Sequence, residues 1–346
     1  MTRETMRVAL YLGPKHIEIR EHEIPEIGER DLLVKIRAAT TCGTDVKTYL
    51  RGHPYWQPPV VFGHEFAGIV VQVGDKVSKF KEGMRVVAAN SAPCNSCFFC
   101  VRGKQNLCDK LKENMLYGAF AEYIRIPAHI VRQNVHQIPN HVPFQAAALT
   151  EPLACVVNGN EAANIHLGDR VAIVGMGPIG LMHLQLAKLS GASHLIAIDI
   201  NPDRLEIAQT LGATDTISPL ETDEVTEVQK LTMGRGADVV IEAAGLPQTW
   251  ENAIEMTRTG GTTVLFGGPK PGTTITLDTN RFHYEELTIK GVFHHTPYYV
   301  QKAADLIFSG TIKVDPLITH EMPLEDLEKA FQKMIEGSAL KVAILP

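Results

Sequence analysis

Four cysteines in one short stretch are the residues of this chain that most clearly offer chemistry. The segment "PCNSCFFCVRGKQNLC" has the pattern C-x2-C-x2-C-x7-C, and the whole chain has six cysteines. Four thiolates satisfy the tetrahedral preference of Zn²⁺, and two-residue spacers let one loop surround an ion. Because thiolates would fill every coordination position, the pattern predicts a structural zinc site at Cys94, Cys97, Cys100 and Cys108.

Two other interpretations of these cysteines are a pair of disulfides and an iron–sulfur cluster. Disulfides are unusual in cytosolic proteins, where clustered cysteines more often bind metal. The long third gap, and the absence of a proline directly after Cys108, fit the bacterial cluster pattern poorly. Zinc is therefore the preferred prediction.

A second candidate metal site lies upstream. The segment "TTCGTDV" contains Cys42, and "VVFGHEFAGIVVQVGD" contains His64 and Glu65. Taken alone, such a cysteine and histidine are more often packing or surface residues. Around them, however, run short segments of β pattern bounded by turn residues, as in a small barrel: "DLLVKIRAAT", "FAGIVVQVG", "RVVAAN" and "FAEYIRIP". Loops on such a scaffold can bring Cys42 and His64 together.

A third segment, "ALTEPLACVVNG", places Glu151 in an otherwise apolar run. Burying an unpaired carboxylate is costly, so a buried salt bridge is the simplest interpretation of this segment alone. Cys155 follows in the same run, and we expect it to be a small buried hydrophobic residue.

The elements that follow predict a nucleotide-binding unit. In "DRVAIVGMGPIGLMHLQLAKLSGASHLIAID", an apolar strand over 171–174 leads into a glycine-rich turn, a helix from Ile179 to about Leu189 and a second strand that ends in Asp199. The turn carries the three glycines of a G-x-G-x-x-G motif, Gly175, Gly177 and Gly180. Such a motif between a strand and a helix indicates dinucleotide binding, with the pyrophosphate at the helix N-terminus and Asp199 on the ribose hydroxyls.

Further strands extend the predicted parallel sheet. They lie in "ADVVIEAAG", "GGTTVLFGG" and "ELTIKGVF", and "TWENAIEMTR" has a helical pattern. Loops at the carboxyl ends of such strands face the cofactor, so "LFGGP" and "VFHH" are expected beside the nicotinamide. The tail "LEDLEKAFQKMIEGSALKVAILP" predicts a helix and a final strand that returns to the first domain.

Composition narrows the functional classes. The chain has 346 residues, a hydrophobic fraction of 45% and a formal net charge of −6. Its basic residues are dispersed, which argues against a nucleic-acid partner. The N-terminus lacks the pattern of a signal peptide, and no apolar run is long enough to span a membrane. We therefore expect a cytoplasmic protein without a membrane partner.

These motifs together resemble the zinc-containing medium-chain alcohol/polyol dehydrogenases. The resemblance runs from about residue 5 to the C-terminus and rests on "GHEFAGIVVQVG", the cysteine lobe, "TEPLACVVNG" and "VAIVGMGPIG" followed by "AID". It implies an α/β protein with a GroES-like β-rich catalytic domain and a Rossmann domain, a doubly wound parallel sheet, with the active site in the cleft between them. The implied bounds are 1–150 for the catalytic domain, with the zinc lobe at about 90–110, 151–290 for the Rossmann domain and 291–346 for the return.

The nearest branches are the sorbitol (L-iditol) and threonine dehydrogenases, and their pattern implies a catalytic zinc. It would be held by Cys42, His64 and, directly or through water, Glu65 or Glu151. Asp45 matches the acid that orients the zinc-bound histidine, and Thr44 matches the hydroxyl that takes the proton of the alcohol. The implied cofactors are two zinc ions per chain and NAD.

The same resemblance extends to the cofactor and substrate contacts. The residues expected at NAD are Gly175, Gly177, Pro178, Ile179, Gly180, Asp199, Arg204, Phe266, Gly267 and Phe293. The substrate pocket is expected to contain Thr48, His294 and His295. Asp199 would repel the 2′-phosphate of NADP, which favours NAD.

The chain departs from the family pattern in two features. Lys47 stands where many relatives have a proton-relay histidine, and His294 and His295 replace the Arg-Tyr pair of polyol dehydrogenases. The expected function is NAD-dependent oxidation of a secondary alcohol on a polyol, cyclitol or sugar derivative. The alternatives are a threonine or butanediol dehydrogenase and a non-catalytic nucleotide-binding protein. We expect a small-molecule alcohol substrate and a homodimer or homotetramer.

Overall fold

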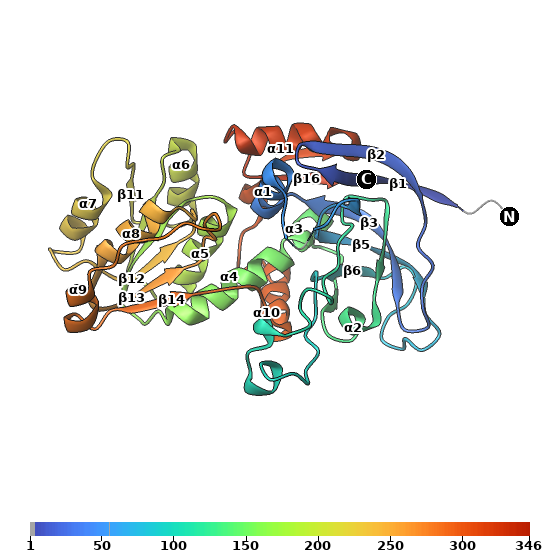
Figure 1. The fold of residues 1–346 in the computed structure, drawn as a ribbon, viewed down its shortest axis with the longest axis horizontal. Helices are drawn as coiled ribbons and strands as arrows, with labels where there is room; N and C mark the ends of the chain where they lie inside the picture. The colour runs from blue at the N-terminus through green and yellow to red at the C-terminus, as the bar shows by residue number, and fades with distance from the viewer. Residues whose placement is uncertain (1–3, 55) are drawn as a thin grey trace. The chain divides into compact units, whose positions relative to one another are not determined.

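The computed structural model describes residues 4–54 and 56–346, and the chain divides into two compact units (Figure 1). The first unit runs to Ala154 and resumes at His295, and the second comprises Cys155–His294. The helix α4 (Thr150–Ala163) contains the boundary between them. The first unit is therefore built from two separate stretches of sequence.

The first unit has more strand than helix, and its strands form two sheets. A three-stranded sheet has the order β2-β1-β4, and a larger sheet has the order β15-β16-β3-β5-β6-β8, with β7 paired to β3. The strands are β1 (Thr5–Gly13), β2 (His16–Glu23), β3 (Leu32–Thr40), β4 (Val60–Val61), β5 (Glu65–Val73), β6 (Arg85–Ala88), β7 (Tyr123–Ile126), β8 (Val135–Gln137), β15 (Ile318–Pro323) and β16 (Lys341–Leu345). Its helices are α1 (Gly43–Arg51), α2 (Ala128–Val131), α3 (Phe144–Ala148), α10 (Pro297–Phe308) and α11 (Leu327–Ile335).

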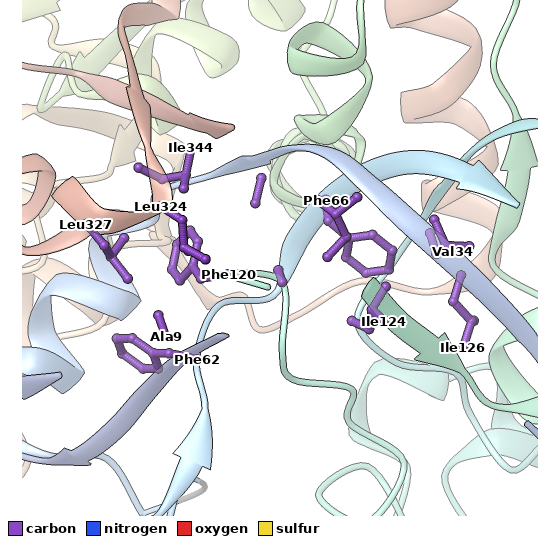
Figure 2. Packing of buried hydrophobic residues seen from close by; sticks show 14 of the residues in the cluster. Ala9, Val34, Phe62, Phe66, Phe120, Ile124, Ile126, Leu324, Leu327 and Ile344 are labelled. Atoms are coloured by element: carbon purple, nitrogen blue, oxygen red, sulfur yellow. The ribbon is translucent and has the colours of Figure 1, made fainter. Parts of the chain in front are cut away.

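The C-terminal return is part of the hydrophobic core of this unit. Strand β16 pairs antiparallel with β3, with Ala343 opposite Thr40. Figure 2 shows Leu324, Leu327 and Ile344 from the return beside residues of the N-terminal part, including Phe62 and Phe120. Each of these apolar side chains contributes roughly 1.5–3 kcal/mol by leaving water. The two stretches of sequence therefore stabilise each other.

The second unit is a parallel sheet of six strands with the order β11-β10-β9-β12-β13-β14. The strands are β9 (Arg170–Val174), β10 (His194–Ile198), β11 (Asp215–Ile217), β12 (Ala237–Glu242), β13 (Thr257–Leu265) and β14 (Thr288–Gly291). Its helices are α5 (Pro178–Leu189), α6 (Pro202–Leu211), α7 (Glu224–Leu231), α8 (Pro247–Met256) and α9 (Thr279–Tyr284). The order reverses at β9, as in a doubly wound Rossmann sheet.

The strands of the second unit are apolar because both faces of the sheet are buried. The central strand β9 is apolar from Val171 onward, as a parallel strand covered by helices requires. Helices α5 and α6 pack against each other, as do α7 and α8. The predicted fold class, a β-rich GroES-like domain with a Rossmann sheet, is confirmed. Among the described residues, no helix has the length and apolarity needed to cross a membrane.

Candidate active site

The four cysteines of the lobe lie close together. Their sulfur atoms are all within 4.8 Å of one another, and the pairs Cys94–Cys100 and Cys97–Cys108 are both 4.0 Å apart. A tetrahedral ion with Zn–S bonds of about 2.3 Å needs sulfur–sulfur edges of about 3.8 Å. A disulfide needs about 2.05 Å, and none of the six cysteines is in a disulfide. The geometry fits a structural zinc and not a pair of disulfides.

The second candidate metal site is at the start of helix α1. Cys42 is the N-cap residue, and its backbone N–H donates to Asp45 Oδ2 at 2.9 Å, while its sulfur accepts from the Thr44 N–H at 3.4 Å. This reciprocal cap satisfies two N–H groups that the helix leaves unpaired. It also fixes the position of Asp45, which is fully buried.

Asp45 in turn orients His64. The His64 Nδ1–H donates to Asp45 Oδ1 across 3.0 Å, which leaves Nε2 for a metal ion. Burial lowers the pKa of His64, but Asp45 and Cys42 together raise that pKa well above its ordinary value. The ligand atoms of Cys42, His64 and Glu65 all lie within 4.8 Å of one another.

Glu65 begins strand β5 and is completely buried. Its Oε2 accepts from Lys341 Nζ at 2.5 Å and from the Thr40 hydroxyl. Its Oε1 is also buried and has no hydrogen-bond partner among the described residues. A thiolate, an imidazole and a carboxylate oxygen without a partner are the donor types that Zn²⁺ takes. The residues therefore fit the expected metal.

Glu151, in the first turn of α4, is buried but does not belong to that ligand group. Burial raises its pKa to about 7, and the charges of His64 and Glu65 act on it in opposite directions. Its Oε1 lies 3.6 Å from His295 Nε2, and the same nitrogen lies 3.0 Å from Asn90 Oδ1. Direct ligation by Glu151 stays a prediction.

The other residues predicted near the substrate differ in exposure. Thr44 and Lys47 are exposed on α1, whereas Thr48 is buried and its hydroxyl donates to the Thr44 carbonyl at 2.7 Å. That bond uses the only hydroxyl hydrogen of Thr48. His294 is in the second unit and has a left-handed backbone, with φ of 59°.

The glycine-rich turn has the close approach that its sequence predicts. Gly175 has φ of +91°, and a Cβ at Gly180 would lie 1.8 Å from the Gly175 carbonyl oxygen. A side chain at Gly180 would therefore push the turn away from the helix. Gly177 caps α5, and Pro178 occupies the first turn, where a missing N–H costs nothing. Ile179 follows within that turn.

Asp199 lies at the carboxyl end of β10 and holds the turn in place. Its Oδ2 accepts from the Met176 N–H at 2.6 Å, and its Oδ1 accepts from the Asn201 N–H at 2.8 Å. Arg204 Nη1 is 3.9 Å from Asp199 Oδ2. The acid expected at the ribose thus also joins the turn to the loop after β10.

The remaining predicted cofactor residues are at the carboxyl ends of later strands. A Cβ at Gly267 would lie 2.4 Å from the Gly245 backbone nitrogen, so two loops meet there without side chains. Phe293 is 47% exposed, whereas the Phe266 ring packs edge-on against the His183 ring at 4.7 Å. His183 is fully buried, and neither ring nitrogen has a hydrogen-bond partner among the described residues.

Sequence reasoning missed Lys341 and Thr40, which hold Glu65. The signal for Lys341 was present in "LKVAILP", where a lysine stands in an apolar strand, the same kind of signal that identified Glu151. Nothing in the sequence connects this lysine to Glu65, because the two meet through two strand pairings, β16 with β3 and β3 with β5, in which Thr40 lies opposite Glu65.

Comparison with known proteins identifies both parts of the chain. Residues 28–140 match the model of the alcohol dehydrogenase GroES-like domain, and residues 178–309 match that of the zinc-binding dehydrogenase. An L-threonine 3-dehydrogenase of Bacillus licheniformis is 38% identical over 93% of both chains. A sorbitol dehydrogenase of Bombyx mori is 34% identical over 97% of both.

Solved structures with the same fold include a zinc-binding dehydrogenase of Sinorhizobium meliloti bound to NADP. It is 32% identical, has a TM-score of 0.92 and is matched over 99% of this chain and 100% of its own. A 2R,3R-butanediol dehydrogenase of Bacillus subtilis is 29% identical, with a TM-score of 0.88 and 99% of each chain covered.

Proposed function

This chain belongs to the zinc-binding alcohol dehydrogenase family, and we propose that it oxidises a secondary alcohol of a polyol, cyclitol or sugar derivative with NAD. The observation that carries the proposal is that the ligand atoms of Cys42, His64 and Glu65 lie close together. Asp45 accepts a hydrogen bond from the His64 ring. A protein that only binds a nucleotide has no need of this metal site. The cofactors of this chain are zinc and a nicotinamide dinucleotide.

A second candidate is oxidation of L-threonine or a small diol such as 2,3-butanediol. Several relatives are L-threonine 3-dehydrogenases, among them those of Bacillus licheniformis and Bacillus subtilis. All these substrates share a secondary hydroxyl next to a carbon that carries a second polar group. We therefore propose that shared feature as the chemical class of the substrate.

The chemistry needs a metal and a hydride acceptor. When bound, zinc would polarise the oxygen of the substrate alcohol, and NAD would accept the hydride from its carbon. Cys42, His64 and one oxygen of Glu65 would hold the metal. The Asp45 carboxylate keeps the His64 ring in one orientation and tautomer. Thr44 is exposed on α1, and its hydroxyl would accept the proton that the alcohol loses on becoming a ketone while giving its own proton to solvent.

We propose NAD as the working cofactor, although the Sinorhizobium meliloti relative holds NADP. Asp199 directly follows β10 and carries a negative charge where a 2′-phosphate would lie. Arg204, 3.9 Å from that carboxylate, would offset part of the repulsion. Its position next to Asp199 also suits a contact along the adenosine ribose.

The test is a substrate panel monitored by NADH absorbance. It contains sorbitol, myo-inositol, L-threonine and 2,3-butanediol, with ethanol as a primary alcohol for comparison. We expect NADH formation with at least one of the first four and a much lower kcat/KM with ethanol. Highest efficiency with L-threonine or butanediol selects the second candidate. No NADH formation by zinc-loaded protein with any of the four contradicts the proposal.

A further inference from the structure

Lys341 is a buried cation at the metal site that the expected chemistry does not use. It lies at the start of β16 and is 2% exposed. Its Nζ donates to the Thr41 carbonyl at 2.7 Å and to Glu65 Oε2 at 2.5 Å. Both partners are next to residues of the site, since Thr41 precedes Cys42 and Glu65 follows His64.

The two oxygens of the Glu65 carboxylate have different surroundings. Oε2 accepts from both Lys341 and the Thr40 hydroxyl, whereas Oε1 is buried with no hydrogen-bond partner among the described residues. A buried carboxylate oxygen normally has a donor or a cation beside it. The ligand atoms of Cys42 and His64 lie within 4.8 Å of a carboxylate oxygen of Glu65.

We propose that Lys341 is a positioning residue that makes Glu65 a metal ligand through one oxygen. By holding Oε2, the ammonium group prevents the carboxylate from turning and leaves Oε1 for the ion. This inference rests on the proposed metal site at Cys42 and His64.

The backbone explains why a residue so late in the sequence can do this. Strand β16 pairs with β3, and Val342 N–H donates to the Thr41 hydroxyl at 2.9 Å. The start of β16 is therefore fixed against Thr40 and Thr41. The Thr41 carbonyl then holds the ammonium group on its other side, so the lysine cannot swing out of the site. A flexible lysine becomes a fixed donor through these bonds.

The direct test compares metal binding by Lys341→Met with that of the wild type, in the full chain. Zinc affinity is measured by competition with a chromophoric chelator, and coordination by the d–d absorption of the Co²⁺-substituted protein. His64→Ala supplies the spectrum of the structural site alone. We expect Lys341→Met to bind the catalytic metal about 10–100-fold more weakly, as loss of a partner behind a metal ligand typically does, and to change the d–d spectrum.

Three variants complete the experiment. Lys341→Arg keeps a cationic donor and should recover much of the affinity and the wild-type spectrum. Thr40→Val removes the second donor to Glu65 Oε2. It should change the metal affinity and the d–d spectrum in the same direction as Lys341→Met does, but to a smaller extent. Lys329→Met removes a lysine whose side chain is 75% exposed, in an ion pair with Asp326, and should change neither measurement.

Unchanged metal affinity and an unchanged d–d spectrum in Lys341→Met would overturn the inference, as would a tighter metal site. If Lys341→Met fails to fold, Thr40→Val decides by the same two measurements. A wild type that takes up no metal beyond the cysteine lobe would instead contradict the proposed function. The two failures are thus distinguishable.

Discussion

Asp45 shows how one residue can serve both a helix and a metal site. One carboxylate oxygen accepts from the Cys42 N–H at the start of α1, and the other accepts from His64. The residue types alone leave the roles of Cys42 and His64 open, and the family resemblance of the sequence predicts them together with Asp45. It does not predict Lys341 or Thr40, because a lysine or threonine in a strand has many uses and only the folded sheet brings them to Glu65.

A prediction at the residue scale concerns the choice of cofactor. We expect kcat/KM with NAD to exceed that with NADP by at least ~100-fold, about 2.7 kcal/mol, because the Asp199 carboxylate repels the 2′-phosphate. Asp199→Ala should narrow the difference between the two cofactors, chiefly by weakening the binding of NAD. Asp199→Asn is the isosteric control, since its amide oxygen can still accept from one of the two backbone N–H groups, of Met176 and Asn201, that Asp199 holds. Steady-state kinetics with both cofactors at one pH measure this, and equal efficiency in the wild type contradicts it.

His183 leads to a prediction about pH. Burial lowers the pKa of His183 to about 3, below the ordinary value of 6.5. Between these values the unfolded chain binds a proton that the folded chain does not, so stability decreases as the pH is lowered below about 6.5. The loss from this one group is at most about 1.4 kcal/mol per pH unit.

The measurement is the thermal unfolding midpoint from pH 7 to pH 5. As the pH is lowered, the unfolding midpoint of His183→Leu should decrease less steeply than that of the wild type, whatever the midpoint of the variant at pH 7. His166→Leu, which replaces a histidine with a 71% exposed side chain, should keep the wild-type slope. Parallel curves for His183→Leu and the wild type would mean that His183 is protonated in the folded protein.

At the scale of elements, the second unit was the easier to predict. The strand over 171–174 and the helix to Leu189 correspond to β9 (Arg170–Val174) and α5 (Pro178–Leu189), because a buried parallel strand and a glycine turn have strong local patterns. The short strands of the first unit gave only a general β pattern. Their pairing depends on contacts distant in sequence, such as β16 with β3, which local pattern does not contain.

The cysteine lobe gives a prediction for one element. The lobe contains only two short 3-10 helices, Cys100–Arg102 and Gln105–Leu107, and one small cluster of buried residues around its cysteines. Metal binding should therefore supply much of its local folding energy. Cys97→Ser should lose one zinc per chain and at least about 2 kcal/mol of stability.

Zinc analysis and thermal unfolding test this prediction. Cys155→Ser is the matched control, because Cys155 lies outside the lobe, and it should keep both zinc ions. A Cys97→Ser variant as stable as the wild type but inactive would mean that the structural and catalytic sites are reversed. Iron or acid-labile sulfide in the wild type would contradict zinc in the lobe.

For the whole molecule, the return of residues 295–346 to the first unit places a buried lysine beside the candidate metal site. The sequence predicted that the tail returns, from its helix-and-strand pattern, and the structure adds that the final strand brings Lys341 to Glu65. The net charge and the composition of the chain could not predict the contact between Lys341 and Glu65, because they contain no information on which strands pair.

Assembly gives a prediction at the same scale. The family resemblance predicts a homodimer or homotetramer. Multi-angle light scattering at the concentration of the activity assay should report a mass of two or four chains. A stable, fully active monomer would contradict the prediction without affecting the metal site.

In the proposed function, a zinc ion held by Cys42, His64 and Glu65 is required for oxidation of the alcohol. One experiment measures zinc content, NADH binding and NADH formation in the wild type and in His64→Ala. We expect two zinc ions per chain and turnover in the wild type. His64→Ala should hold one zinc, bind NADH as the wild type does and lose at least ~1000-fold in kcat/KM. A His64→Ala protein that keeps two zinc ions and turns over like the wild type would contradict the account.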